Sequence, residues 1–115
     1  MRLKSGIFVA AIVRTANGAG AFAAVRRRGA EEAGAVFVKV ATLDGCAALY
    51  GPAPQSAFDE AFPADRRFRV LVAAGRPEAD SEARMTKELR FDPDLWFVEI
   101  EDRTGRPFVE VMEDE

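Results

Sequence analysis

Residues 91–102 constrain the fold more than any other segment, because the hydrophobic periodicity changes there from helical to extended across one proline, Pro93. Residues 78–91 follow Pro77, which favours a helix start, and Pro93 then disfavours helical geometry in the residue before it. Residues 95–101 alternate, and one face is apolar at every position: Trp96, Val98 and Ile100. The segment predicts a helix over 78–91 and a strand over 95–101 with Trp96, the only tryptophan, in the core.

Residues 4–17 also show helical periodicity. Their apolar residues share one helical face: Phe8, Val9, Ile12, Val13 and Ala16. Ser5 suits an N-cap, and Asn17 followed by Gly18 supplies a stop. A helix is therefore expected, although the apolar run over 7–13 also fits a buried strand.

Strand patterns occupy much of the remaining chain. They cover residues 21–28 and 35–40, and the Asp44-Gly45 turn leads to a third strand that ends near Tyr50. We expect these three strands to form an antiparallel meander. Residues 68–72 fit a fourth strand, although they also suit a helix. A turn at residues 103–106 brings back an apolar segment over 108–111.

A chain of 115 residues fits one domain with one core. The expected fold class is α+β, with a mainly antiparallel sheet of four or five strands and two helices packed against one face. The expected domain spans residues 1–112, and the acidic residues 113–115 form a tail that is expected to fray.

The chain is expected to be cytoplasmic and not embedded in a membrane. Its longest apolar run, residues 7–13, is far shorter than the ~20 residues of a membrane span. A basic start before this run imitates a signal peptide, but Arg14 closes the run and no convincing cleavage site follows. The single cysteine, Cys46, cannot form an internal disulfide, which agrees with a reducing compartment.

Charge is unevenly distributed along the chain. Residues 1–40 hold seven basic and two acidic residues, a balance of +5, whereas residues 76–115 hold six basic and thirteen acidic residues, a balance of -7. The folded surface can therefore be electrostatically two-sided. A sequence pI near 5.1 disfavours a dedicated nucleic-acid binder, because phosphate contacts need a broad basic surface.

The composition limits the chemistry. The chain has no histidine, which removes the usual general base near neutral pH and every Ser-His or Cys-His nucleophile pair. Cys46 alone cannot build a thiolate zinc site. We therefore predict no catalytic residues, no metal site and no cofactor, and we favour a non-catalytic protein over an enzyme.

Several carboxylates near the carboxyl end suggest magnesium ligands or an acid/base pair: Asp92, Asp94, Glu99, Glu101 and Asp102. A solvated row of charges beside basic neighbours explains them better. Pro93-Asp94 with Glu99-x-Glu101 also suggests a nuclease motif, but the lysine of that motif is missing.

The sharpest enzyme-like pattern is residues 18–23, which satisfy G-x-G-x-x-A of a dinucleotide-binding turn. The cofactor-binding residues of this alternative would be Gly18, Gly20, Ala23 and Asp44. It requires residues 7–13 to be a strand and residues 21–28 to be a helix, the reverse of the preferred assignment.

A basic run supplies the expected interaction surface: Arg26, Arg27 and Arg28, to which Phe37 is expected to add an exposed aromatic. Such a tip suits a phosphate or an acidic partner. A solvated hairpin end that pairs with Glu31, Glu32 or the acidic carboxyl-terminal strand is the simpler interpretation.

Five segments together point to a known family. They are residues 1–6 (MRLKSG), 20–23 (GAFA), 25–29 (VRRRG), 49–54 (LYGPAP) and 91–96 (FDPDLW). The sequence resembles, over most of residues 1–108, a family of short alphaproteobacterial proteins known as domain of unknown function 1491. The resemblance implies a compact cytoplasmic domain and no activity that can be assigned to particular residues.

The sequence thus predicts a small non-catalytic protein that acts by binding an unknown protein partner or by forming a homo-oligomer. The alternative is a nucleotide-binding or small-ligand-binding protein, or an enzyme, that uses the glycine-rich residues 18–23.

Overall fold

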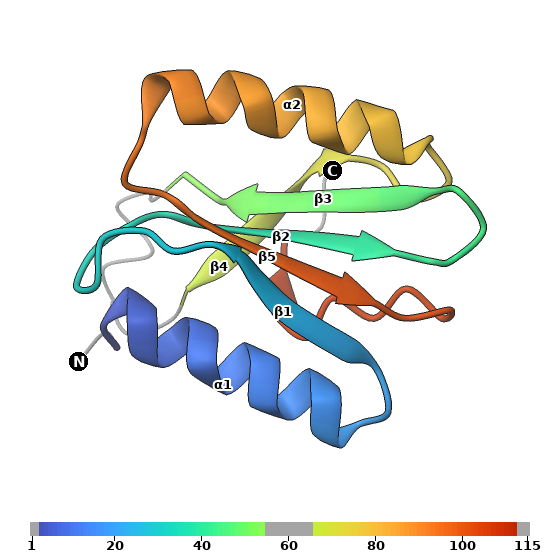
Figure 1. Cartoon of the computed structure of the whole chain (residues 1–115), viewed down its shortest axis with the longest axis horizontal. Coiled ribbons are helices and arrows are strands. Elements are labelled where there is room, and N and C mark those ends of the chain that lie inside the picture. The colour runs from blue at the N-terminus through green and yellow to red at the C-terminus, as the bar shows by residue number, and fades with distance from the viewer. Residues whose placement is uncertain (1–2, 55–65, 113–115) are drawn as a thin grey trace.

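A computed structural model describes residues 3–54 and 66–112, and it shows one sheet between two helices (Figure 1). The elements in chain order are α1 (Ser5–Gly18), β1 (Phe22–Arg27), β2 (Val36–Ala41), β3 (Ala47–Pro52), β4 (Arg67–Val72), α2 (Glu78–Phe91), β5 (Trp96–Glu101) and β6 (Glu110–Val111). The predicted α+β class is confirmed. The sheet has six strands where four or five were expected, because the short β6 pairs in parallel with β4.

The strand order is β1-β5-β2-β3-β4-β6, so the expected meander of the first three strands is wrong. β2 and β3 pair antiparallel as predicted, but β5 lies between β1 and β2. β5 runs parallel to β2 and antiparallel to β1. The first three residues of β5 are buried, so both of its faces are covered, which suits the middle of a sheet, whereas β1 is mostly exposed and forms an edge.

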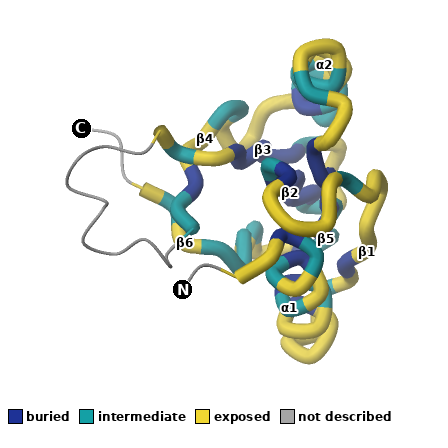
Figure 2. Tube along the Cα trace, turned by 90° about the vertical axis from the view of Figure 1, so that its left-hand side faces the viewer, coloured by how far each residue is buried: buried dark blue, intermediate teal, exposed yellow. Residues whose placement is uncertain are grey.

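The two helices cover opposite faces of the sheet (Figures 1 and 2), so the expectation that both pack on one face is wrong. On the α1 side the core includes Val9, Ile12, Val38, Trp96 and Val98. On the α2 side it consists of Phe37, Leu49, Met85, Leu95 and Phe97. Successive residues of a strand point to opposite faces, so the run 95–98 supplies apolar side chains to both layers.

Residues 5–18 form a helix, which decides between the two assignments left open by the sequence. Ser5 is its first residue rather than its cap, and Lys4 in the cap position makes no side-chain capping bond. The buried Ser5 hydroxyl instead donates a 2.6 Å hydrogen bond to the Gly34 carbonyl. The Ser5 and Gly6 amides donate to the carbonyls of Glu32 and Glu31, so the loop before β2 satisfies the start of α1.

The carboxyl end of α1 is tied to the edge strand. The Asn17 side chain accepts a 2.8 Å hydrogen bond from the Ala23 amide and donates a 3.3 Å bond to the Ala23 carbonyl. Ala23 belongs to β1, whose outer edge has no neighbouring strand among the described residues. Asn17 therefore occupies backbone groups that another strand would otherwise pair with.

The turn between β2 and β3 holds two residues in the left-handed region, Leu43 at φ 66° and Gly45 at φ 86°. Asp44 closes the turn by accepting a 2.6 Å bond from the Thr42 hydroxyl and a 3.1 Å bond from the Cys46 amide. The Gly45 carbonyl accepts a bond from the Glu78 amide, so the turn also fixes the start of α2. The predicted helix over 78–91 and its end before Asp92 are confirmed.

Trp96 lies in the core as predicted, with 2% of its surface exposed. Its indole Nε1 donates a 2.8 Å hydrogen bond to the Ala30 carbonyl. The Ala30 amide in turn donates a 2.8 Å bond to the Asp94 carbonyl. The loop between β1 and β2 is therefore fastened to the start of β5 by bonds on both sides of Ala30.

Candidate functional site

The predicted basic tip is engaged within the chain. Arg26 forms ion pairs with Glu82 and Glu99, and the Arg27 guanidinium donates a 2.7 Å bond to the Pro93 carbonyl. Arg28 lies 3.4 Å from Glu31, and its guanidinium carbon is 5.5 Å from the centre of the Trp96 ring. The run therefore acts as three separate contacts rather than as one open phosphate site.

Phe37 does not belong to an exposed surface, because only 6% of it is exposed. Its side chain lies in the apolar core between the sheet and α2. The expectation of an exposed aromatic is wrong because α2 covers the face of β2 that holds Phe37 and Lys39.

Lys39 is the centre of a five-residue charge cluster, here called the Lys39 cluster: Arg26, Lys39, Glu78, Glu82 and Glu99. The Lys39 side chain is only 4% exposed, and its Nζ lies 2.9 Å from Glu78, 2.7 Å from Glu82 and 3.4 Å from Glu99. Arg26 donates two bonds to Glu82, of 2.6 and 3.0 Å, and its guanidinium carbon lies 4.7 Å from the Phe97 ring centre. The cluster joins β1, β2 and β5 to α2.

Arg26, Lys39 and Glu82 of the cluster keep their charges at neutral pH. Hydrogen bonds from Arg26 lower the pKa of Glu82 to about 2, and Lys39 adds to the effect. Burial acts to lower the pKa of Lys39, but hydrogen bonds to Glu82 and Glu78 outweigh it and the pKa is raised. A base with a low pKa beside an amine with a high pKa does not exchange protons near pH 7. The cluster is therefore suited to holding α2 on the sheet and not to acid/base catalysis.

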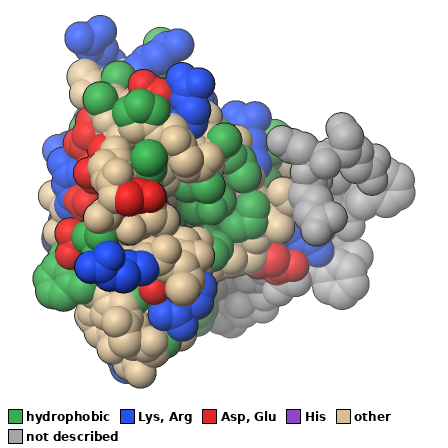
Figure 3. All heavy atoms as spheres, turned by 90° about the vertical axis from the view of Figure 1, so that its right-hand side faces the viewer, with side chains coloured by type: hydrophobic (Ala, Val, Ile, Leu, Met, Phe, Trp, Pro, Cys, Tyr) green, Lys and Arg blue, Asp and Glu red, His purple; other side chains and the backbone are tan. Residues whose placement is uncertain are grey.

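The ion pairs of the Lys39 cluster bring the basic first part of the chain into contact with its acidic last part. The positive excess of the first forty residues meets the negative excess of the last forty at Arg26, Lys39, Glu82 and Glu99. On the face seen in Figure 3, basic and acidic side chains lie beside one another along the left edge. On this face the charges are mixed and not sorted into two sides.

The glycine-rich segment does not have the geometry that a dinucleotide site requires. Gly18 ends helix α1, Gly20 adopts a left-handed φ of 90°, and Ala23 is buried in strand β1. Asp44 lies in the turn between β2 and β3. A dinucleotide-binding turn leads from a strand into the start of a helix, whereas this one leads from a helix into a strand. The four residues of the dinucleotide-binding alternative are therefore not assembled into a site.

The carboxylates near the carboxyl end serve local structure. Asp92 accepts a 3.0 Å bond from the Asp94 amide after α2, and Glu99 belongs to the Lys39 cluster. Asp102 accepts bonds from the Arg106 side chain and amide, which lower the pKa of Asp102. No group of three metal-binding side chains is placed to hold an ion within residues 3–54 and 66–112.

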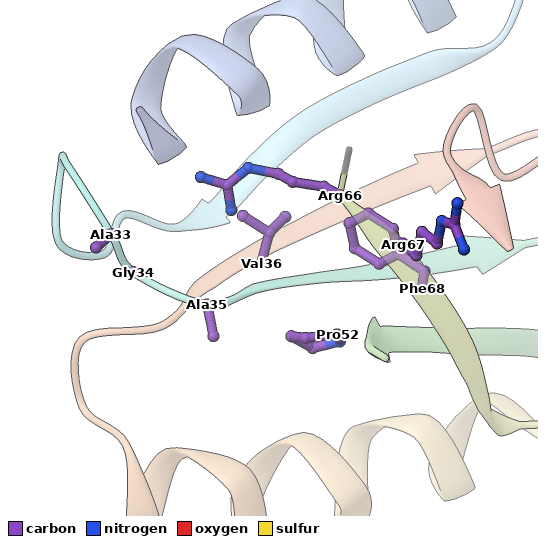
Figure 4. A pocket seen from close by; sticks show the side chains of 8 residues that line it. All are labelled: Ala33, Gly34, Ala35, Val36, Pro52, Arg66, Arg67 and Phe68. Carbon is purple, nitrogen blue, oxygen red and sulfur yellow. The ribbon is translucent and has the colours of Figure 1, made fainter. Parts of the chain in front are cut away.

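Two adjoining pockets lie at the end of the sheet where β2 begins, and we call them together the Arg66 groove because both include Arg66 and Ala33. The first has a volume of about 170 Å³ and mainly apolar walls: Ala35, Val36, Pro52 and Phe68 (Figure 4). The second has a volume of about 280 Å³, and its walls include the charged side chains of Lys4 and Glu32.

Arg66 stands where the two pockets meet, and several contacts hold it. Its Nη2 donates a 2.8 Å bond to the Leu3 carbonyl and a 3.2 Å bond to the Ser5 hydroxyl. The guanidinium carbon lies 5.0 Å from the Phe8 ring centre. In Figure 4 the guanidinium extends above Val36 toward the Ala33–Gly34 turn, whereas Arg67 points away. The Ser5 hydroxyl therefore helps to orient Arg66 by accepting a hydrogen bond from it, while it donates its own hydrogen bond to the Gly34 carbonyl.

Sequence reasoning missed both Lys39 and Arg66 as organising residues. Lys39 had a signal, because Glu78 and Glu82 are one turn apart on a helix and Glu99 lies on the exposed row of a strand. Arg66 had none, because its partners at Leu3 and Ser5 are more than sixty residues away.

A protein-family model matches nearly the whole chain. Residues 3–110 match the model of the family described as "Protein of unknown function (DUF1491)". The chain belongs to the DUF1491 family. The resemblance noted in the sequence is thereby confirmed. A comparison with curated proteins gives no match.

Solved DUF1491 structures share the fold. The solution structure of protein Atu0922 from A. tumefaciens is 44% identical, with a TM-score of 0.85, over 100% of this chain and 98% of that one. A crystal structure of a DUF1491 protein from Caulobacter crescentus CB15 is 39% identical, with a TM-score of 0.81, over 98% of this chain and 100% of that one. An NMR structure from the same organism is 40% identical, with a TM-score of 0.80, over 98% and 99%.

Within residues 3–54 and 66–112, no helix is both long and apolar enough to cross a membrane.

Proposed function

We propose that this protein is a non-catalytic binding protein that takes a short segment of a partner protein into the Arg66 groove. The observation that carries the proposal is the guanidinium of Arg66, fixed between an apolar pocket and a charged one. A fixed guanidinium recognises a carboxylate with little loss of conformational freedom. The matching segment has an apolar side chain next to a carboxylate.

The size of the apolar pocket supports a peptide side chain over a cofactor. Pockets for small molecules usually have volumes of roughly 300–1,000 Å³, whereas this one has about 170 Å³. Such a volume suits one aliphatic side chain and is too small for a dinucleotide. The lack of histidine and the neutral-pH charge state of the Lys39 cluster support a binding role over catalysis. A lone cysteine supports a reducing, cytoplasmic location.

The test is an NMR titration of the ¹⁵N-labelled protein with acetyl-Ala-Ala-Leu carrying a free carboxylate. The matched probe is the same peptide with a terminal carboxamide. We expect the amide signals of Ala33, Ala35 and Phe68 to shift with the carboxylate peptide, and the carboxamide to bind about tenfold more weakly, as one charge-assisted bond contributes.

Three variants make the result specific. Arg66→Gln should remove the preference for the carboxylate, and Arg69→Gln, an exposed residue of β4 outside the groove, should leave it unchanged. Ala33→Leu narrows both pockets from an exposed position and should weaken both peptides. An absence of shifts at millimolar peptide, or equal binding to wild type and Arg66→Gln, contradicts the proposal.

A further inference from the structure

The outward face of α1 is unusually apolar for an exposed helix surface. Ile7 is 52% exposed, Ala10 and Arg14 are exposed, and Ala11 is partly exposed. The spacing i, i+3, i+4, i+7 puts these four residues on one face. Figure 2 shows the exposed side of α1 turned away from the sheet. Arg14 is the only charged residue in the helix, so the face lacks the mixed charges that usually cover a solvated helix.

We infer that this face binds a second copy of the same chain, with the two α1 helices packed antiparallel across a two-fold axis. The small side chains of Ala10 and Ala11 at the centre let two helix backbones approach closely. The two Ile7 side chains then flank the crossing and lose contact with water. This inference is independent of the Arg66 groove, because none of these four residues lines it.

Charge decides the direction of the two helices. An antiparallel crossing between Ala10 and Ala11 puts Arg14 of one copy level with Gly6 and Ile7 of the other. The Glu31 carboxylate lies against Gly6, where a β-carbon would overlap it. Each Arg14 therefore faces the partner's Glu31, once on each side of the axis. A parallel pair would instead bring the two Arg14 side chains together.

The length of α1 sets the strength of the contact. Fourteen residues make a helix about 21 Å long, and one helix pair of this length buries less surface than the roughly 1,200 Å² of a stable interface. We therefore expect a reversible dimer that forms at high micromolar concentration.

Sedimentation equilibrium of the full chain tests the inference over about 10 µM to 1 mM, the range that such a small contact requires. We expect the weight-average mass to rise from one chain toward two. Ala10→Glu should raise the dissociation constant at least about tenfold, because it puts two carboxylates close together at the centre of the crossing. The variant should still fold, because Ala10 is exposed and glutamate is a good helix former. Phe91→Glu is the matched control, since Phe91 is 80% exposed on α2.

A charge exchange tests the direction. Arg14→Glu and Glu31→Arg should each weaken association, because each places like charges opposite one another in its own dimer. An equimolar mixture of the two variants restores both opposite-charge pairs and should associate about as well as wild type. Wild type that stays monomeric at 1 mM, equal effects of Ala10→Glu and Phe91→Glu, or a mixture no better than its components would overturn the inference. The peptide titration repeated on monomeric Ala10→Glu separates this outcome from that of the groove.

Discussion

Lys39 in β2 and Glu82 in α2 are joined by a 2.7 Å contact between Nζ and Oε2, although one lies in a strand and the other in a helix 43 positions later. Lys39 is held between the sheet and α2 with 4% of its side chain exposed, so its charge depends on three carboxylates from two elements. The pair shows how a charged residue can occupy a core position when its partners arrive from elsewhere in the chain.

Replacing Lys39 by methionine should destabilise the protein by about 2–4 kcal/mol at pH 7, because three carboxylates lose their shared partner. The loss should shrink as pH falls toward 2, where Glu82 takes up a proton in the folded protein. Urea unfolding at pH 7 and at pH 2 measures both values. An equal loss at the two pH values would show that packing rather than charge holds Lys39.

Glu82→Gln should remove part of the acid sensitivity of the fold. The folded pKa of Glu82, about 2, lies below its ordinary value of 4.5, so its contribution is complete above pH 4.5 and is lost as pH falls toward 2. The variant should lose about 1 kcal/mol at pH 7, since the side chain is 39% exposed and solvent screens the pair. It should differ little from wild type near pH 2. Thermal unfolding across pH 2–7 provides the comparison, and Glu88→Gln on the same helix is the control.

Trp96→Ala should cost about 3–5 kcal/mol, a large share of the roughly 5–15 kcal/mol of a typical domain. Trp96→Phe should cost less, because it keeps most of the buried ring and loses the bond to the Ala30 carbonyl. Fluorescence of the folded wild type should show a blue-shifted maximum and little quenching by iodide. Emission like that of indole in water would contradict the burial.

Asn17→Ala should expose the edge of β1. It removes both bonds to Ala23 and should cost about 1 kcal/mol. Because a free strand edge templates pairing, light scattering after heating should also increase. Thr15→Ala, at an exposed position in the same helix, should change neither measurement.

Gly29→Ala should destabilise the protein by about 1–3 kcal/mol, because a β-carbon would overlap the backbone of Asp94 and Leu95. Gly18→Ala should be close to neutral, because a β-carbon there meets nothing within 4 Å. Urea midpoints of the two variants make the test, and equal midpoints would show that the loop moves freely away from β5.

The sequence predicted the local elements better than their arrangement. The helix over 78–91 and the burial of Trp96 follow from Pro77, Pro93 and an apolar alternation, all of which act over a few residues. The position of β5 in the sheet cannot be predicted from such local patterns, because its pairing joins residues as far apart in the sequence as Ala23 and Ile100. A strand buried on both faces signals a central position, and the apolar run from Leu95 to Val98 carried that signal.

The burial of Lys39 and Phe37 and the contacts of Arg66 were also hard to predict, because they depend on segments distant in the sequence. Lys39 alternates with Val38 and Val40, which predicts that Lys39 lies on an exposed face of its strand. That face is buried because α2 packs on it, and the prediction of an exposed Phe37 is wrong for the same reason. Arg66 depends on Ser5, whose hydroxyl turns to Gly34 instead of capping its helix.

The insertion of β5 between β1 and β2 has a consequence for synthesis on the ribosome. β1 and β2 leave the ribosome early, but the strand that joins them follows more than fifty residues after β2. Until then β1 lacks the strand that it pairs with, and the nascent chain carries an incomplete core. Pairing between such distant strands is also slow, because a long loop must close first. Premature stops anywhere before residue 101 should therefore yield fragments that chaperones and proteases recognise as unfolded.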